Sequence, residues 1–77
     1  MPPPKILVYM QPTRPPCRTL REYLSAKGAD FEELDVTRDH QALEDLVEVH
    51  HSRMIPTLVI GDKVIIGFDR DQLEELL

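Results

Sequence analysis

The residues best suited to chemistry lie in the stretch Arg14-Pro15-Pro16-Cys17. Two cysteines separated by two residues form a common redox motif, and here the second position holds Cys17 whereas the first holds Arg14. Cys17 is the only cysteine of the chain, so no internal disulfide can form. Disulfide reduction needs a thiolate that attacks the substrate disulfide, and a guanidinium cannot act as this nucleophile. The stretch therefore indicates a redox turn that lacks one of its two thiols.

Both residues have alternative interpretations. Cys17, Leu20 and Leu24 repeat with helical spacing, so Cys17 is expected to be a small buried apolar residue. The alternative is a slow monothiol that forms mixed disulfides through Cys17. Arg14 is either a solvated loop residue or an anchor for an anion at the start of the helix. The two prolines that follow it favour the first interpretation, because they remove N–H donors from the anion-binding turn.

Hydrophobic periodicity and turn residues predict the elements that position this stretch. They are a strand at 5–10, a helix at 15–27, a parallel strand at 30–36, a helix at 39–50, a hairpin of strands at 57–60 and 63–66, and a helix from residue 69. The second helix is expected to bury Leu43, Leu46, Val47 and His50, and the third to place Leu73, Leu76 and Leu77 against the sheet. Asp39 and Asp69 are the expected N-caps, with Gln72 completing a capping box and Phe68 a hydrophobic staple to Leu73.

Length and charge limit the function classes. The 77 residues are sufficient for one domain, with a proline-rich tail at 1–4. A net charge of −5 without a basic stripe argues against nucleic acid. The sequence contains no apolar run long enough to span a membrane and no recognisable targeting segment. We therefore expect a protein of the cytoplasm. We also expect a monomer. No metal site is expected, because among the histidines only His50 and His51 adjoin and the single cysteine is distant.

Three short segments resemble the glutaredoxin family of the thioredoxin fold, and the resemblance extends over residues 5–77. Val8-Tyr9 through Pro12 and Pro15-Pro16-Cys17 resemble the family's strand, loop and Cys-Pro-x-Cys turn. Ile55-Pro56-Thr57 resembles the segment that contains the family's cis-proline, which faces the dithiol. Gly67-Phe68-Asp69 resembles the segment that begins the last helix and helps to hold glutathione or a partner.

The resemblance implies a fold and an activity. The implied fold is β-α-β-α-β-β-α, a four-stranded mixed sheet flanked by three helices. The implied activity is thiol–disulfide oxidoreduction linked to glutathione or thioredoxin reductase. This activity is expected to be impaired, because Arg14 occupies the position of the family's nucleophilic cysteine. Only Cys17, at the position of the resolving cysteine, is present. The implied binding residues are Ile55, Pro56, Thr57, Gly67, Phe68 and Asp69. No tightly bound cofactor is implied, although glutathione is a possible ligand.

A second function class stays open on the sequence. The groove beside Pro56 needs no thiol to bind glutathione, a peptide or a protein with an extended segment, so the chain could be a redox-silent binding module. A third class, the N-terminal domain of a glutathione-transferase-like protein, is disfavoured because no helical second domain follows in this sequence.

Overall fold

Residues 4–77 form four strands and three helices in the order expected from the sequence. The computed structural model describes residues 4–77, so most of the predicted N-terminal tail, residues 1–3, lies outside the described part. The strands are β1 (Ile6–Met10), β2 (Phe31–Asp35), β3 (Thr57–Ile60) and β4 (Lys63–Ile66). The helices are α1 (Pro15–Ala26), α2 (His40–Glu48) and α3 (Arg70–Leu76).

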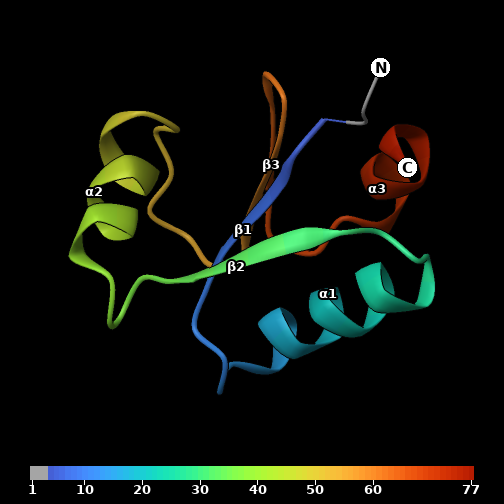
Figure 1. Ribbon diagram of the computed structural model, residues 1–77, viewed down its shortest axis with the longest axis horizontal. Coiled ribbons are helices and arrows are strands. Elements are labelled where there is room, and N and C mark those ends of the chain that lie inside the picture. Colours follow the sequence, from blue (N-terminus) through green and yellow to red (C-terminus); the bar gives the residue numbers. More distant parts are fainter. Residues whose placement is uncertain (1–3) are drawn as a thin grey trace.

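The strands form one mixed sheet in the order β2-β1-β3-β4. β1 runs parallel to β2, with Ile6 opposite Phe31, and antiparallel to β3, with Tyr9 opposite Thr57. β3 and β4 form the expected antiparallel hairpin. Helices α1 and α3 lie on one side of the sheet, and α2 lies on the other (Figure 1).

The larger core lies between the sheet and helices α1 and α3. Because side chains alternate across a strand, Ile6, Val8 and Met10 of β1 point to this face. The other buried members come from β3, β4 and the two helices: Leu58, Ile60, Ile65, Cys17, Leu20, Leu24 and Leu73. The helical stripe predicted for α1 is therefore confirmed, with Leu20 and Leu24 fully buried.

The smaller core lies between the sheet and α2, and here one prediction is wrong. Ala42 and Leu46 pack against Tyr9 and Val59 of the sheet. Leu43, which was expected in the buried stripe, is 41% exposed. The α2 helix is short, and the residues that point at the sheet are Ala42 and Leu46, so Leu43 points beside the sheet rather than onto it.

The α3 helix gives a second correction. Leu73 is fully buried in the larger core, but Leu76 and Leu77 are 39% and 44% exposed. A helix of seven residues places only one leucine over the sheet before it ends. The Asp69 carboxylate caps this helix by accepting a hydrogen bond from the Gln72 N–H at 3.1 Å, as expected. The Asp39 carboxylate caps α2 in the same way, by accepting from the Ala42 N–H.

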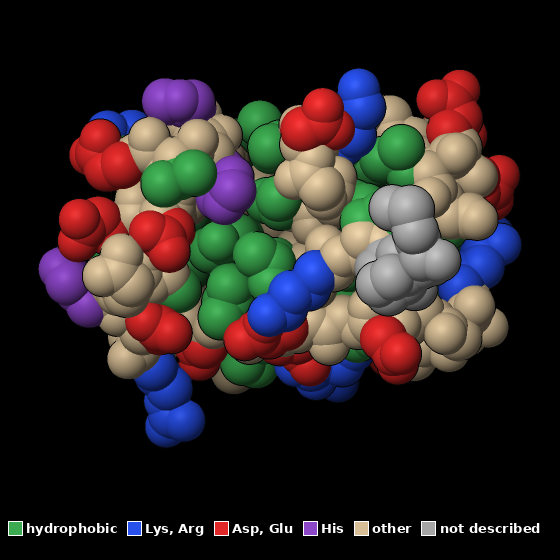
Figure 2. Space-filling view, turned by 45° about the horizontal axis from the view of Figure 1, so that its top comes forward, with side chains coloured by type: hydrophobic (Ala, Val, Ile, Leu, Met, Phe, Trp, Pro, Cys, Tyr) green, Lys and Arg blue, Asp and Glu red, His purple; other side chains and the backbone are tan. Residues whose placement is uncertain are grey.

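One face of the hairpin remains partly open. Val64 and Ile66 of β4 lie opposite Val59 and Thr57, on the side of the sheet that α2 occupies. They are 38% and 50% exposed, because α2 packs mainly over β1, which β3 separates from β4 in the sheet. Figure 2 shows hydrophobic side chains gathered in a hollow beside α2, with acidic side chains around it. No helix within residues 4–77 is long and apolar enough to cross a membrane.

Candidate functional site

The site begins where β1 passes into α1. Arg14 occupies the N-cap position of α1, in extended backbone, and its side chain makes no capping bond to the helix. Its N–H donates to the Gln11 carbonyl at 3.0 Å, and its side-chain Nε donates to Gln11 Oε1 at 3.2 Å. The next two residues are prolines, which suit the first helical turn because that turn leaves N–H groups without intrahelical partners. Arg14 is thus an exposed cation at the mouth of α1.

Cys17 lies one turn deeper and faces the larger core. Its side chain is 4% exposed and belongs to the larger core, with Leu20 and Leu24. Its N–H donates to the Arg14 carbonyl at 3.1 Å, which ties the two residues through the backbone. The structure therefore places Arg14 at the surface of the site and buries the sulfur of the only cysteine beneath it.

The loop before β3 is held by two buried hydroxyl groups. Thr57 Oγ1 donates to the Met54 carbonyl at 2.6 Å and lies 2.8 Å from Ser52 Oγ. Ser52 Oγ accepts a hydrogen bond from the Met54 N–H at 3.2 Å. Ser52 is 2% exposed and Thr57 is fully buried, so these bonds satisfy polar groups that water does not reach. They fix the path of the chain through Ile55 and Pro56.

Ile55 presents its backbone at the surface of this loop. The Ile55–Pro56 peptide bond is cis, and Pro56 is fully buried. Within the described residues, neither the N–H nor the carbonyl of Ile55 has a hydrogen-bond partner, whereas the Pro56 carbonyl accepts from the Gly67 N–H at 2.7 Å. The free groups of Ile55 are therefore the ones that could pair with an extended ligand.

The segment Gly67-Phe68-Asp69 lies beside this loop but has mainly structural contacts. Gly67 has a φ of +77°, a conformation that other residues adopt at a cost. Phe68 packs against the larger core and makes an edge contact with the Tyr23 ring. The N–H of Gln72 holds the pKa of Asp69 below its usual value, because the bond favours the carboxylate form. Of these three, only Gly67 is bonded directly to the Ile55–Pro56 loop.

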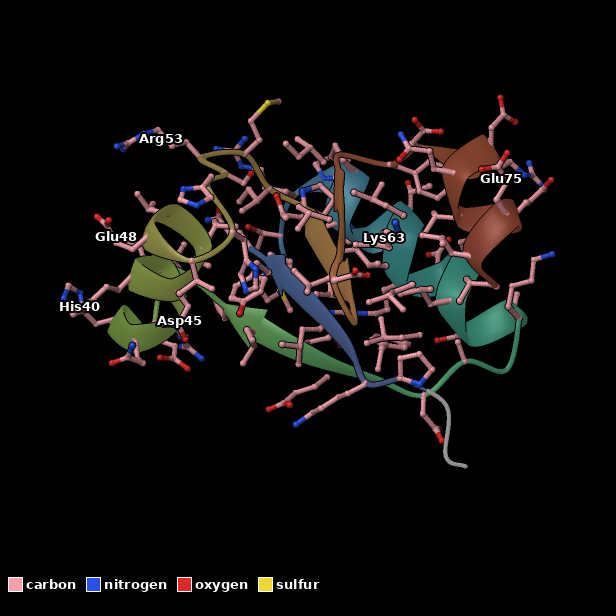
Figure 3. The ribbon with its side chains drawn as sticks, turned by 90° about the horizontal axis from the view of Figure 1, so that it is seen from above. His40, Asp45, Glu48, Arg53, Lys63 and Glu75 are labelled. Carbon is pink, nitrogen blue, oxygen red and sulfur yellow. The ribbon has the colours of Figure 1, made fainter. Side chains whose placement is uncertain are left out.

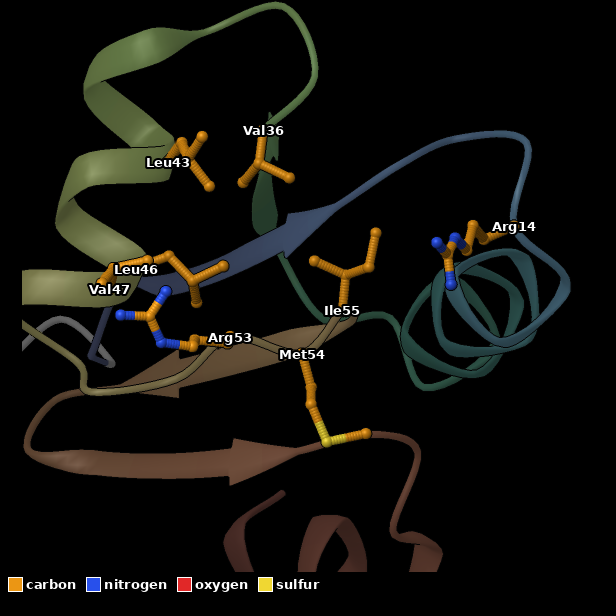
Figure 4. A pocket seen from close by; sticks show the side chains of 8 residues that line it. All are labelled: Arg14, Val36, Leu43, Leu46, Val47, Arg53, Met54 and Ile55. Atoms are coloured by element: carbon orange, nitrogen blue, oxygen red, sulfur yellow. The ribbon is translucent and has the colours of Figure 1, made fainter.

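A groove of about 380 Å³ joins Arg14 to this loop. Its lining comes from the N-cap of α1, the β2–α2 connection, α2 and the loop before β3: Arg14, Val36, Leu43, Leu46, Val47, Arg53, Met54 and Ile55. We refer to it as the Arg14–Arg53 groove. Figure 4 shows Arg14 and Arg53 at opposite ends, with Ile55 between them. Cys17 does not line it, and neither do Gly67, Phe68 and Asp69.

Two residues that shape the site were not expected from the sequence: Ser52, which holds the loop before β3, and Arg53, which lines the groove. Both lie between the helix predicted at 39–50 and the strand predicted at 57–60, and no periodic pattern marks them. The signal that could have indicated Ser52 is its spacing of five residues from Thr57 across Pro56, which allows two hydroxyl groups to close a loop. Arg53 has no such signal. It extends from the loop after α2, on the same side of the molecule as that helix (Figure 3).

Tyr9 and His50 form a second polar pair, behind the groove. The Tyr9 hydroxyl lies 3.2 Å from His50 Nε2, and the two rings are 5.3 Å apart. Burial raises the pKa of Tyr9, and the nearby Asp45 carboxylate raises it further. Among residues 4–77 no group of three His, Cys, Asp or Glu side chains could hold a metal ion. The site therefore consists of two cations, an aliphatic floor and free backbone groups.

Comparisons with known proteins give the family. The Glutaredoxin family model matches residues 6–65. The chain is 34% identical over 73 residues to the Gene 56 protein of Mycobacterium phage L5, covering 94% of this chain and 71% of that protein.

Two solved structures are also similar to the chain in sequence and fold. The thioredoxin-like protein BC3987 is 39% identical, with a TM-score of 0.89 over 94% of this chain and 99% of that one. The glutaredoxin-like NrdH-redoxin of Escherichia coli is 27% identical, with a TM-score of 0.84 over 95% of each chain. These similarities confirm the thioredoxin-like fold expected from the sequence. Since the family model spans most of its length, the chain belongs to the glutaredoxin family.

Proposed function

We propose that the chain is a glutaredoxin-like thiol–disulfide redox protein whose turnover is impaired because Arg14 occupies the position of the nucleophilic cysteine. One observation carries this proposal: Arg14 occupies the N-cap position of α1, three residues before the only cysteine, at the helix mouth where an exposed thiol would be activated. Its guanidinium is permanently charged and cannot attack sulfur. The related NrdH-redoxin has a thioredoxin-like activity profile, so the donor could be glutathione or thioredoxin reductase.

Any residual chemistry must pass through Cys17. Its thiolate would attack one sulfur of a substrate disulfide, forming a mixed disulfide and releasing the other sulfur as a thiolate. A glutathione thiolate would then attack the substrate sulfur of that mixed disulfide and release Cys17 as a thiolate, so that each step exchanges one S–S bond for another. Because Cys17 is 4% exposed, both attacks require an opening of the α1 start and are expected to be slow.

A second candidate is a redox-silent binding module, and a specific observation favours it. The Arg14–Arg53 groove and the free backbone groups of Ile55 do not depend on a thiol. Glutathione or an extended segment of a partner protein could pair with Ile55 as an added strand. In either case we propose a monomer that acts in the cytoplasm, where a single thiol remains reduced, with no tightly bound cofactor.

Replacing Arg14 by cysteine separates the two candidates. Arg14→Cys is expected to create glutathione-dependent reduction of a small disulfide such as hydroxyethyl disulfide, whereas the matched Arg14→Ser variant is expected to stay inactive. Glutathione reductase and NADPH supply the electrons, and NADPH consumption is the readout. If Arg14→Cys folds, as judged by circular dichroism, and reduces no disulfide with either glutathione or thioredoxin reductase, the redox proposal is overturned and the binding module stands.

A further inference from the structure

The charge of the Arg14–Arg53 groove differs from that of the chain around it. The sequence has 14 acidic and nine basic residues, yet the groove lining includes two arginines and no carboxylate. Within residues 4–77 neither Arg14 nor Arg53 forms a salt bridge. The basic side chains that do pair with carboxylates, such as Arg21 with Glu33, lie elsewhere. Two unpaired cations therefore border one groove of an acidic protein.

Between the cations the groove is aliphatic. Its floor consists of side chains from the β2–α2 connection, α2 and the loop before β3, namely Val36, Leu43, Leu46, Val47 and Ile55. Leu43 is 41% exposed and Met54 62% exposed, so apolar surface remains open to a ligand there. The volume of about 380 Å³ accommodates a large apolar side chain. Glutathione carries no such side chain, so it would leave this floor uncovered.

We propose that the groove selects an extended segment of a partner protein in which a large apolar side chain is flanked by carboxylates. The apolar side chain lies on the aliphatic floor, and the carboxylates bind Arg14 and Arg53 at its two ends. The backbone of the segment pairs with the free N–H and carbonyl of Ile55. This inference rests on the binding role proposed above for the same groove, and it names the class of partner.

Arg14 then has a role of its own. A guanidinium binds a carboxylate through two parallel hydrogen bonds, which an exposed thiol at this position could not provide. Pro15 and Pro16 remove N–H donors from the helix mouth, so the side chain of Arg14 supplies most of the attraction for an anion there. The bond from Arg14 Nε to Gln11 Oε1 orients the guanidinium and leaves its terminal nitrogens for a ligand.

The test uses short fluorescent peptides and fluorescence anisotropy. The probe has a central leucine between two pairs of glutamates, with both termini blocked. The matched controls replace the glutamates by glutamines, replace them by lysines, or replace the leucine by alanine. The acidic leucine peptide is expected to bind most tightly, and its affinity should fall as salt is raised because the contacts are charged. Excess glutathione is expected to compete weakly.

Chain variants locate the contacts. Arg14→Gln and Arg53→Gln are each expected to weaken binding of the acidic leucine peptide by about three- to ten-fold, the range for single charge-assisted contacts. Lys63→Gln removes the same charge from β4, outside the groove (Figure 3), and should leave binding unchanged. If the glutamine peptide binds as well as the acidic one, or the three variants weaken binding equally, the charge selection is overturned while the groove stands. If no peptide binds, the inference is overturned whatever Arg14→Cys does in the reductase assay.

Discussion

The hydroxyl oxygens of Ser52 and Thr57 lie 2.8 Å apart in a part of the molecule that solvent does not reach. Their bonds to Met54 place the Ile55 backbone at the edge of the Arg14–Arg53 groove. The pair thus links the buried start of β3 to the surface on which a ligand would bind. Its removal should affect both the stability of the fold and the shape of the groove.

Thr57→Val should destabilise the chain, because the valine keeps the shape of threonine but removes the hydroxyl that bonds to the Met54 carbonyl and to the Ser52 hydroxyl. The expected loss in the free energy of unfolding is about 1–3 kcal/mol, the range when buried polar groups lose a hydrogen-bond partner. Urea unfolding followed by circular dichroism measures it. In a double-mutant cycle with Ser52→Ala, the loss of unfolding free energy in the double variant should be smaller than the sum of the two single losses, by about 1 kcal/mol. Strictly additive losses would show that the two hydroxyl groups act independently.

Cys17 should react slowly with alkylating reagents in the folded chain, because its side chain is 4% exposed beneath α1. Iodoacetamide labelling followed by mass spectrometry should be slow in buffer and rapid in urea. Labelling in buffer at the rate of a free thiol would show that α1 opens readily at its start.

Substitution of Cys17 tests the same burial through stability. Cys17→Ala removes one buried atom and should cost about 1 kcal/mol, in the range for small core truncations. Cys17→Ser has nearly the original size but places a hydroxyl among apolar side chains, so it should cost more, about 1–3 kcal/mol. Thermal or urea unfolding compares the two variants. A serine variant more stable than the alanine variant would indicate that the position is polar or hydrated.

The capping of α3 should make stability depend on pH in acid. The Gln72 N–H and its side-chain amide, whose Nε2 lies 2.6 Å from Asp69 Oδ2, favour the Asp69 carboxylate and lower its pKa in the folded chain. A pKa that is lower in the folded than in the unfolded chain contributes stability above about pH 4, and this contribution is lost as the pH falls through the folded value. Asp69→Asn should therefore flatten the dependence of the unfolding midpoint on pH in acid. Asp62→Asn, in the β3–β4 turn, is the matched control.

Tyr9 should make stability depend on pH in alkali, with the opposite sign. Burial raises the pKa of Tyr9, so the folded chain retains the phenolic proton more strongly than the unfolded chain does. The associated stability is present below about pH 10 and is lost as the pH rises through the folded value. Tyr9→Phe should remove this loss, and at neutral pH it should cost about 0.5–1.5 kcal/mol because the hydrogen bond to His50 disappears. An unchanged alkaline profile in Tyr9→Phe would contradict the assignment.

Much of the fold follows from local sequence features. The proline pair after Arg14 and the Gly61-Asp62 turn mark where elements begin and reverse, and the spacing of Leu20 and Leu24 identifies the buried side of α1. Local periodicity does not reveal how far a helix extends over a sheet. For that reason Leu43 and Leu76 were predicted to be buried although both are exposed.

The groove was harder to predict than the fold. Arg14 and Ile55 were recognisable from short motifs, but they are 41 residues apart, and the aliphatic floor between them comes from other segments. Arg53 belongs to a connection without periodicity, so its position at the end of the groove follows only from the way the α2–β3 loop folds back. The hydroxyl pair of Ser52 and Thr57, which sets that path, depends on tertiary structure.

The position of Cys17 beneath α1 has a consequence for any covalent association of the protein. A sulfur buried in the larger core cannot reach the sulfur of another molecule while both are folded. Air oxidation should then leave the native protein as single chains, and molecules that unfold even briefly should accumulate as disulfide-linked pairs. A band of doubled mass on a non-reducing gel would thus be a record of past unfolding rather than a sign of redox activity.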